Sequence, residues 1–205
     1  MKDRWEDMWE KLGAHGVPQD VFDELVQGYS SPDRFYHSLT HVEDCLALVD
    51  KTRSLAAHPE EVELAIWFHD AVYDTRRDDN EQKSAAWAEA VTRDAGLSNA
   101  IAERVSRSIL ATRHDTQVTD TDSQLLVDVD LSILGREAEV FWQYEEDIRK
   151  EYAWVPAERF RPARMKILQG FLDRRHIYYH QEYREMFETT ARLNLGQAIE
   201  RLSGS

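Results

Sequence analysis

Apolar residues recur at helical spacing along most of this sequence. Phe22, Leu25 and Tyr29, for example, are three and four positions apart, which places them on one face of a helix. The same spacing predicts helices over residues 5–12, 21–29, 39–55, 80–95, 99–111, 123–134, 140–152, 167–172 and 185–202, and one that starts at Pro59. No alternation of apolar and polar residues is long enough to predict a strand. The pattern therefore predicts an all-α protein.

Turn-forming residues separate these predicted helices. The segment 28–33 is rich in glycine, serine and proline, Gly96 divides two helices, and the polar segment 116–122 is predicted to be a loop. Gly135 ends the helix before it, and a break is expected over Pro156–Pro162. Since the sequence shows no repeat, low-complexity tract or linker, we expect a single compact helical domain.

Composition narrows the classes of partner and location. The 205 residues have a formal net charge of −14, which argues against a nucleic-acid polymer or an anionic membrane as partner. A small phosphorylated substrate is still compatible, because a metal ion and a few arginines can reverse the charge of a cleft locally. No apolar run approaches the ~20 residues that span a bilayer, and the N-terminus lacks the apolar stretch of a signal peptide. Cys45 is the single cysteine, which rules out an internal disulfide and a cysteine-rich zinc site, so a cytoplasmic protein is expected.

Four ionisable residues interrupt otherwise apolar helix faces. They are His41, His69, Asp70 beside it, and Asp130, and they belong to three different predicted helices. Burying an isolated carboxylate costs several kcal/mol, so these groups need partners or a cation. One divalent ion bound by two imidazoles and two carboxylates would satisfy all four. Such a ligand set suits Mn, Fe, Zn, Co, Ni or Mg, and leaves positions for water and substrate.

Each of these residues alone also has an ordinary structural explanation. A histidine on an apolar face is often a hydrogen-bonded core residue, and an aspartate there is often a helix cap or half of an ion pair. A His-Asp dipeptide is not rare either, because His114-Asp115 is a second one. The combination and its spacing, rather than any single residue, therefore indicate a metal site.

These residues lie in three motifs: Tyr36-His37-Ser38-Leu39-Thr40-His41, Trp67-Phe68-His69-Asp70-Ala71-Val72-Tyr73-Asp74 and Val127-Asp128-Val129-Asp130-Leu131-Ser132-Ile133-Leu134-Gly135. The three motifs and their order resemble the HD superfamily of metal-dependent phosphohydrolases. The resemblance implies metal ligands at His41, His69, Asp70 and Asp130, the same four residues. It also implies one HD-type domain over residues 1–205. In that domain 1–30 would be an N-terminal helical extension, 31–135 the metal-ligand core and 136–205 the C-terminal helices that complete it.

Further segments resemble one bacterial subfamily of predicted HD phosphohydrolases of about this length. They are Asn80-Glu81 with Ser84, Ala111-Thr112-Arg113-His114, Arg149-Lys150-Glu151-Tyr152, and Glu188 with Ala191-Arg192-Leu193-Asn194. Relatives that hydrolyse ppGpp have a Glu-Asp pair where this chain has Tyr73-Asp74, which weakens that assignment. The Gly-Tyr-Pro motif of the cyclic-di-GMP phosphodiesterases is absent from the sequence, which excludes that branch.

Other residues have candidate catalytic or substrate-binding roles. Asp74 lies four residues after Asp70, hence on the same face if the helix continues, and could act as general base or be a surface cap. Glu81 could be a proton donor or an ordinary first-turn glutamate, and His114 a general acid, a further ligand or a helix-end histidine. Because guanidinium groups bind phosphate oxygens, the candidate substrate-binding arginines are Arg34, Arg113, Arg161 and Arg164, with Arg174 as a further candidate. His37, four residues before His41, and Tyr36 beside it are candidates because they could face the substrate.

Together these features predict an enzyme that hydrolyses a phosphate ester or anhydride of a small molecule, most plausibly a nucleotide, with a metal-activated water. Two alternatives stay open. One is a di-iron oxygenase of the same superfamily, for which His37, Glu81 and His114 offer additional ligands. The other is a non-catalytic module that senses a nucleotide. Formation of a homodimer is also left open, since the apolar N-terminal helix could pack on the domain or on a second subunit.

Overall fold

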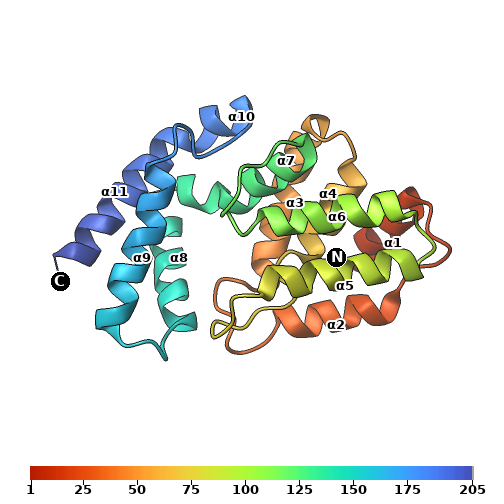
Figure 1. Ribbon diagram of the computed structural model, residues 1–205, viewed down its shortest axis with the longest axis horizontal. Coiled ribbons are helices and arrows are strands. Elements are labelled where there is room, and N and C mark those ends of the chain that lie inside the picture. Colours follow the sequence, from red (N-terminus) through yellow and green to blue (C-terminus); the bar gives the residue numbers. More distant parts are fainter. Residues whose placement is uncertain (205) are drawn as a thin grey trace. The chain divides into compact units, whose positions relative to one another are not determined.

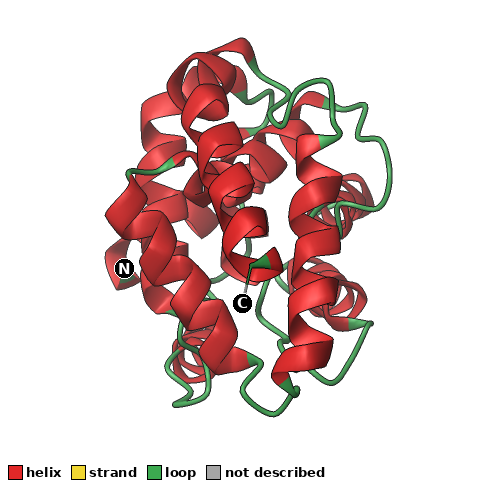
Figure 2. Ribbon diagram, turned by 90° about the vertical axis from the view of Figure 1, so that its left-hand side faces the viewer, coloured by secondary structure: helices red, strands yellow, loops and turns green. Residues whose placement is uncertain are grey.

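The computed structural model describes residues 1–204, and every regular element in that range is a helix (Figure 2). The prediction of an all-α protein is confirmed. The chain divides into two compact units, Met1–Val129 and the part from Asp130 onward. No helix in the described range has both the length and the apolar character needed to cross a membrane.

The first unit is built around one buried helix. Its elements are α1 (Lys2–Leu12), α2 (Gln19–Tyr29), α3 (Leu39–Thr52), the 3-10 turn η1 (Arg53–Leu55), α4 (Pro59–Phe68), α5 (Asn80–Asp94), α6 (Asn99–Ala111) and α7 (Thr121–Asp130). Helix α4 contacts α1, α3, α5 and α6, and α5 and α6 lie side by side (Figure 1). Every residue of α4 from Glu61 to Phe68 is buried, which makes this helix the centre of the unit.

Sequence chemistry explains where α4 begins. Pro59 occupies the first turn, where its missing N–H is not needed, and Glu60 and Glu61 place negative charge at the positive end of the helix dipole. The carboxylate of Asp122 accepts hydrogen bonds from the backbone N–H groups of Ala57 (2.7 Å) and His58 (3.1 Å) just before the helix. The start of α4 is thus tied to α7, the helix that ends at Asp130.

Two buried glutamates of α4 are paired with arginines. Arg104 donates two hydrogen bonds to Glu61, at 2.7 and 2.6 Å, and Arg4 donates one to Glu63 at 2.7 Å. These pairs compensate the cost of burying the carboxylates and connect α4 with α6 and α1.

The N-terminal helix belongs to the core of the first unit. Trp5 and Trp9 are fully buried, and the ring centroid of Trp5 lies 5.4 Å from that of Trp67 in an edge-to-face arrangement. Such aromatic contacts add to the area that the rings bury. The apolar face of this helix is therefore covered within its own unit.

The second unit consists of longer helices and short irregular turns. Its elements are the 3-10 turn η2 (Leu131–Gly135), α8 (Ala138–Glu151), α9 (Ala157–Leu172), α10 (Gln181–Tyr183), the π-helical turn η3 (Arg184–Glu188) and α11 (Thr189–Ser203). Helices α9 and α11 lie side by side (Figure 1). The expected break over Pro156–Pro162 is wrong in its extent: Pro156 precedes α9, but Pro162 lies inside the helix on its exposed side. Packing of the buried face of α9 outweighs the hydrogen bond that Pro162 cannot donate.

Three residues of the subfamily motifs form side-chain hydrogen bonds to main-chain groups in this unit. Asn194 donates to the carbonyls of Leu134 and Arg136, both at 2.9 Å. The Glu188 carboxylate accepts from the N–H of Ile177 at 3.0 Å. Arg149 donates to two carbonyls beyond the end of α8, at 2.6 and 3.0 Å. These side chains bond main-chain groups in turns and loops, where backbone groups have no regular helical partner.

Candidate metal site

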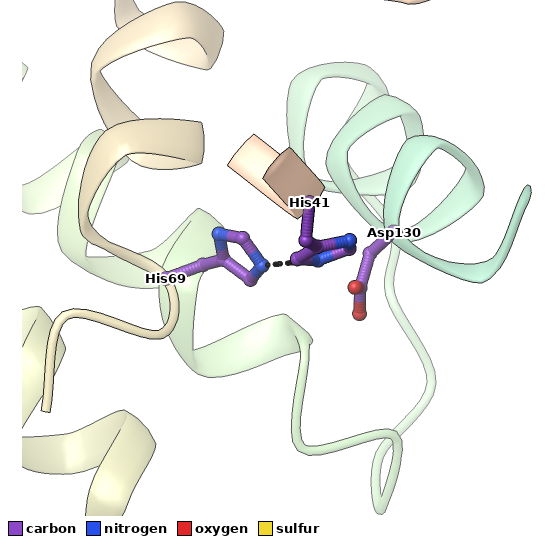
Figure 3. Close-up of side chains that lie close together, drawn as sticks. All are labelled: His41, His69 and Asp130. Carbon is purple, nitrogen blue, oxygen red and sulfur yellow. Dashed lines mark hydrogen bonds between the residues drawn. The ribbon is translucent and has the colours of Figure 1, made fainter. Parts of the chain in front are cut away.

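Three side chains come together at the ends of helices. His41 lies in the first turn of α3, His69 is the residue directly after α4, and Asp130 is the last residue of α7. One ligand atom of each of His41, His69 and Asp130 lies within 4.8 Å of the others, and Figure 3 shows the side chains pointing toward one another. His41 and His69 are buried, and Asp130 is half-buried. The group could therefore hold a metal ion.

The two histidine rings present the same nitrogen to each other. Nε2 of His41 lies 3.1 Å from Nε2 of His69 (dashed line in Figure 3). On the far side of its ring, Nδ1 of His69 lies 2.8 Å from the carbonyl oxygen of Ile66, which can only accept, so Nδ1 carries the proton. In neutral His69 the Nε2 atom therefore presents a lone pair, which is the form that binds a metal.

Asp70 places a carboxylate at the same point. Its Oδ2 atom lies 3.0 Å from Nε2 of His69 and 3.9 Å from Nε2 of His41. Asp70 is not a member of the tightest group of three, but its oxygen is as near to His69 as His41 is. Asp70 therefore lies next to two of the three residues of that group.

The donor set fits a divalent cation. Two nitrogen ligands about 2.1 Å from one ion and about 90–110° apart are separated by roughly 3.0–3.4 Å, and the Nε2 atoms of His41 and His69 have this separation. The lone pair on Nε2 of neutral His69 faces a carboxylate oxygen of Asp70 at 3.0 Å, an arrangement that needs a proton or a cation between the two atoms. Imidazole and carboxylate ligands do not select one metal among the first-row ions.

The segment after His69 is a loop, not a continuation of the helix. Helix α4 ends at Phe68, so Asp74 does not share a helix face with Asp70, and that expectation is wrong. Asp74 is exposed, and its carboxylate accepts a hydrogen bond from the N–H of Arg76 at 2.9 Å. Its role as general base stays a prediction, now from a loop position.

Residues of the following helix hold this loop by its main chain. The side chain of Asn80 bonds both the N–H of Asp74 (3.1 Å) and its carbonyl (3.0 Å), and the Ser84 hydroxyl accepts from the N–H of Val72 at 3.0 Å. The sequence showed Asn80 and Ser84 as parts of a motif. Their hydrogen bonds to the main chain of the loop are tertiary contacts that sequence spacing does not reveal. Glu81 starts α5 next to Asn80.

Aromatic rings lie next to the metal-ligand group. The Tyr36 ring centroid is 4.7 Å from that of His41, and His37 stacks on Tyr73 with centroids 4.3 Å apart. Tyr36 therefore contacts a predicted ligand directly, whereas His37 contacts the loop that follows Asp70. Tyr73 was not singled out as a site residue from the sequence, because its ring could be placed only once the loop was known.

Arg34 is directed at the main chain of the same region. Its guanidinium donates to the carbonyls of Asp70 (2.7 Å), Ala71 (2.9 Å) and His37 (3.2 Å). It lies over the rings of Tyr29 and Tyr73, at 4.9 and 5.3 Å from their centroids. Arg34 was predicted to bind substrate, and the structure shows three of its hydrogen bonds engaged within the protein.

Arg113 and His114 lie beyond the end of α6. Arg113 forms an ion pair with Asp115 at 3.1 Å, and His114 has a left-handed backbone with φ of 59°. Histidine is among the few residues that adopt this conformation at moderate cost. The turn that this backbone makes explains a histidine here without reference to catalysis.

The remaining predicted arginines belong to the second unit. Arg164 is buried and donates to Glu145 at 2.5 Å and to the Tyr144 hydroxyl at 2.7 Å. Burial alone would lower the pKa of Arg164, but Tyr144 and Glu145 outweigh it and raise that pKa above its usual value. Arg161 lines a groove of about 530 Å³ together with Trp142 and other side chains. Arg174 packs over the Phe171 ring at 4.7 Å.

Comparisons of the chain with protein-family models, with curated proteins and with solved structures found no match. The resemblance to the HD superfamily consequently stays a prediction drawn from the motifs of this sequence.

Proposed function

We propose that this chain is a metal-dependent phosphohydrolase of the HD type, which cleaves a phosphate ester or anhydride of a small molecule such as a nucleotide. The observation that supports this function best is the convergence of His41, His69 and Asp130 on one point, with an oxygen of Asp70 3.0 Å from His69. Two imidazoles and two carboxylates form a donor set that suits a divalent first-row metal ion.

The side chains of the candidate site would have different roles in this reaction. His41, His69, Asp70 and Asp130 would hold one divalent ion, which when bound lowers the pKa of water toward neutrality and polarises a phosphoryl oxygen. The Nδ1–H of His69, bonded to the Ile66 carbonyl, keeps the opposite nitrogen available as a ligand.

Proton transfer needs a second titratable group near the ligands. Asp74, Glu81 and His114 are the candidates from the sequence. The Asp74 carboxylate already accepts a backbone N–H, whereas Glu81 forms no hydrogen bond or ion pair within residues 1–204. Glu81 is therefore our first choice for moving the proton, and Asp74 the second.

A metal-dependent turnover screen tests this function. Protein stripped with a chelator would be reloaded with Mn²⁺, Fe²⁺, Co²⁺, Ni²⁺, Zn²⁺ or Mg²⁺ and tested for phosphate release from nucleotides, ppGpp and simple phosphate esters. The variants His69→Ala and Asp130→Asn should lose bound metal and activity. The matched control Asp44→Asn removes an exposed acid from α3 and should retain both.

Two results would contradict the hydrolase. Two irons per chain with a visible absorption band and O₂ consumption would indicate the oxygenase alternative. Metal bound by the wild type, with tight nucleotide binding but no phosphate release under any ion, would indicate the sensing alternative.

A further inference from the structure

The end of α4 presents a structural problem for the metal site. His69 closes the helix, and Asp70 follows it in a segment without regular hydrogen bonding. Carbonyl groups at a helix C-terminus have no helical partner. A carboxylate on such a segment would sample many positions unless other groups hold its main chain.

The guanidinium of Arg34 supplies that hold. Its Nη1 atom donates to the carbonyl of Asp70 at 2.7 Å and to that of His37 at 3.2 Å, while Nη2 donates to the carbonyl of Ala71 at 2.9 Å. His37 lies in the bend that precedes α3, four residues before His41. One planar group therefore connects the segment that leads into α3 with the two residues that follow His69.

Arg34 is itself held in place. Its guanidinium lies 4.9 Å from the ring centroid of Tyr29 and 5.3 Å from that of Tyr73. Tyr29 is almost fully buried, and its hydroxyl donates to the main-chain carbonyl of Trp67 at 3.0 Å. Arg34 is thus fixed by a ring that is anchored on α4, close to the residues that Arg34 bonds.

We propose that Arg34 is a positioning residue that sets the Asp70 carboxylate against His69 and completes the metal-ligand set. Arg34 acts through the main chain, because its three hydrogen bonds go to carbonyl oxygens. This inference rests on the proposed metal site, but it does not depend on which reaction the site performs.

The shape of the guanidinium is essential to this role. Arginine offers five N–H groups in one rigid plane, which lets it reach three carbonyls at once. A lysine ammonium has the same charge but is a point donor on a flexible stem. Arg34→Lys therefore preserves charge and removes the connection, which makes it the informative substitution.

The experiment uses Co²⁺ as the probe ion. The stripped full-length protein is titrated with Co²⁺ by calorimetry, and the visible band of the bound ion reports its ligand geometry. Arg34→Lys should raise the Co²⁺ Kd about 10- to 100-fold, the usual effect of removing a group that orients a metal ligand, and should alter the band. Arg34→Gln should have at least as large an effect, and Arg34→Lys serves as the test if the glutamine variant does not fold.

Two controls separate positioning from general stability. Arg104→Lys weakens the contact between α6 and Glu61 on α4, so it should lower Tm but leave Kd and the band unchanged. If Arg34 acts through Asp70, the double variant Arg34→Lys/Asp70→Ala should bind Co²⁺ no more weakly than Asp70→Ala alone.

The outcomes are distinct. A wild-type Kd and spectrum in Arg34→Lys, while Asp70→Ala weakens binding, would overturn the role of Arg34 and leave the metal site intact. Additive effects in the double variant would also overturn it. Failure of the wild type to bind Co²⁺ would overturn the metal site and this role together, and absence of phosphate release would concern only the hydrolase.

Discussion

Replacing Arg164 with methionine distinguishes a structural role from a phosphate-binding one. The side chains of Arg164 and Glu145 are only 8% and 12% exposed, and they are joined at 2.5 Å. Arg164→Met fills similar space but leaves the Glu145 carboxylate without this counter-charge. Removing one partner of a buried ion pair costs about 3–5 kcal/mol, much more than losing an exposed pair.

Urea unfolding measures this cost. With an m value of about 1.5 kcal/mol/M, a loss of that size lowers the urea midpoint by roughly 2–3 M. The double variant Arg164→Met/Glu145→Met should recover most of the stability, since an apolar pair of similar volume often replaces a buried ion pair without loss. Lys166→Met, an exposed change on the same helix, should stay within about 0.5 kcal/mol of the wild type.

An unchanged urea midpoint in Arg164→Met would show that the pair does not stabilise the fold. If the same variant bound nucleotide more weakly, the sequence-based prediction of Arg164 as a phosphate ligand would be preferred.

Three further predictions concern single contacts. Burial raises the pKa of Tyr29 well above its usual value. Above about pH 10, Tyr29 therefore loses its proton in the unfolded chain before it does so in the folded protein. The free energy of unfolding falls as pH rises further. Tyr29→Phe should cost about 1 kcal/mol at pH 7 but make that alkaline fall shallower in urea titrations; an unchanged slope would contradict the assignment. Asp122→Ala should cost about 1–2 kcal/mol through the lost hydrogen bonds to the N–H groups of Ala57 and His58 just before α4, and Asp122→Asn should recover part of it in the same assay. Gly135→Ala places a Cβ 2.5 Å from Cβ of Phe187 and should lower stability by about 1–3 kcal/mol, whereas Gly170→Ala meets nothing within 4 Å and should not lower Tm.

Helix positions were predictable where the spacing of apolar residues agreed with the residues that cap or end a helix. The range 99–111 matches α6 at both ends, because Ser98 caps the helix with its side chain and polar residues follow it. The range 123–134 was less accurate, since α7 ends at Asp130 and a tighter 3-10 turn follows. The apolar residues of that turn continue a helical spacing, so the sequence pattern alone did not separate the two forms.

In the candidate site, the residues on helix faces were predictable from the sequence, but the contacts of the loop were not. Helix faces were sufficient to bring His41, His69 and Asp130 together, because each interrupts an apolar face. The position of Asp74 was not predictable, since the loop after α4 is held by hydrogen bonds that Arg34 donates to the carbonyl of Asp70 and Asn80 donates to the carbonyl of Asp74. Such contacts join residues distant in sequence and leave no periodic signal.

The buried helix α4 has a consequence for how the candidate site opens. Helices α1, α3, α5 and α6 surround it, so its amides should exchange with solvent hydrogen only when the whole first unit unfolds. Apart from short-range backbone hydrogen bonds, such as that from the N–H of Ala71 to the carbonyl of Phe68 (3.0 Å), the loop after His69 is held by side chains such as Arg34 and Asn80, so it can open at much smaller free-energy cost. Amide protection should therefore fall steeply between His69 and Val72. His69 would keep its position until the first unit unfolds. The candidate site would therefore open first at the neighbouring residue, Asp70.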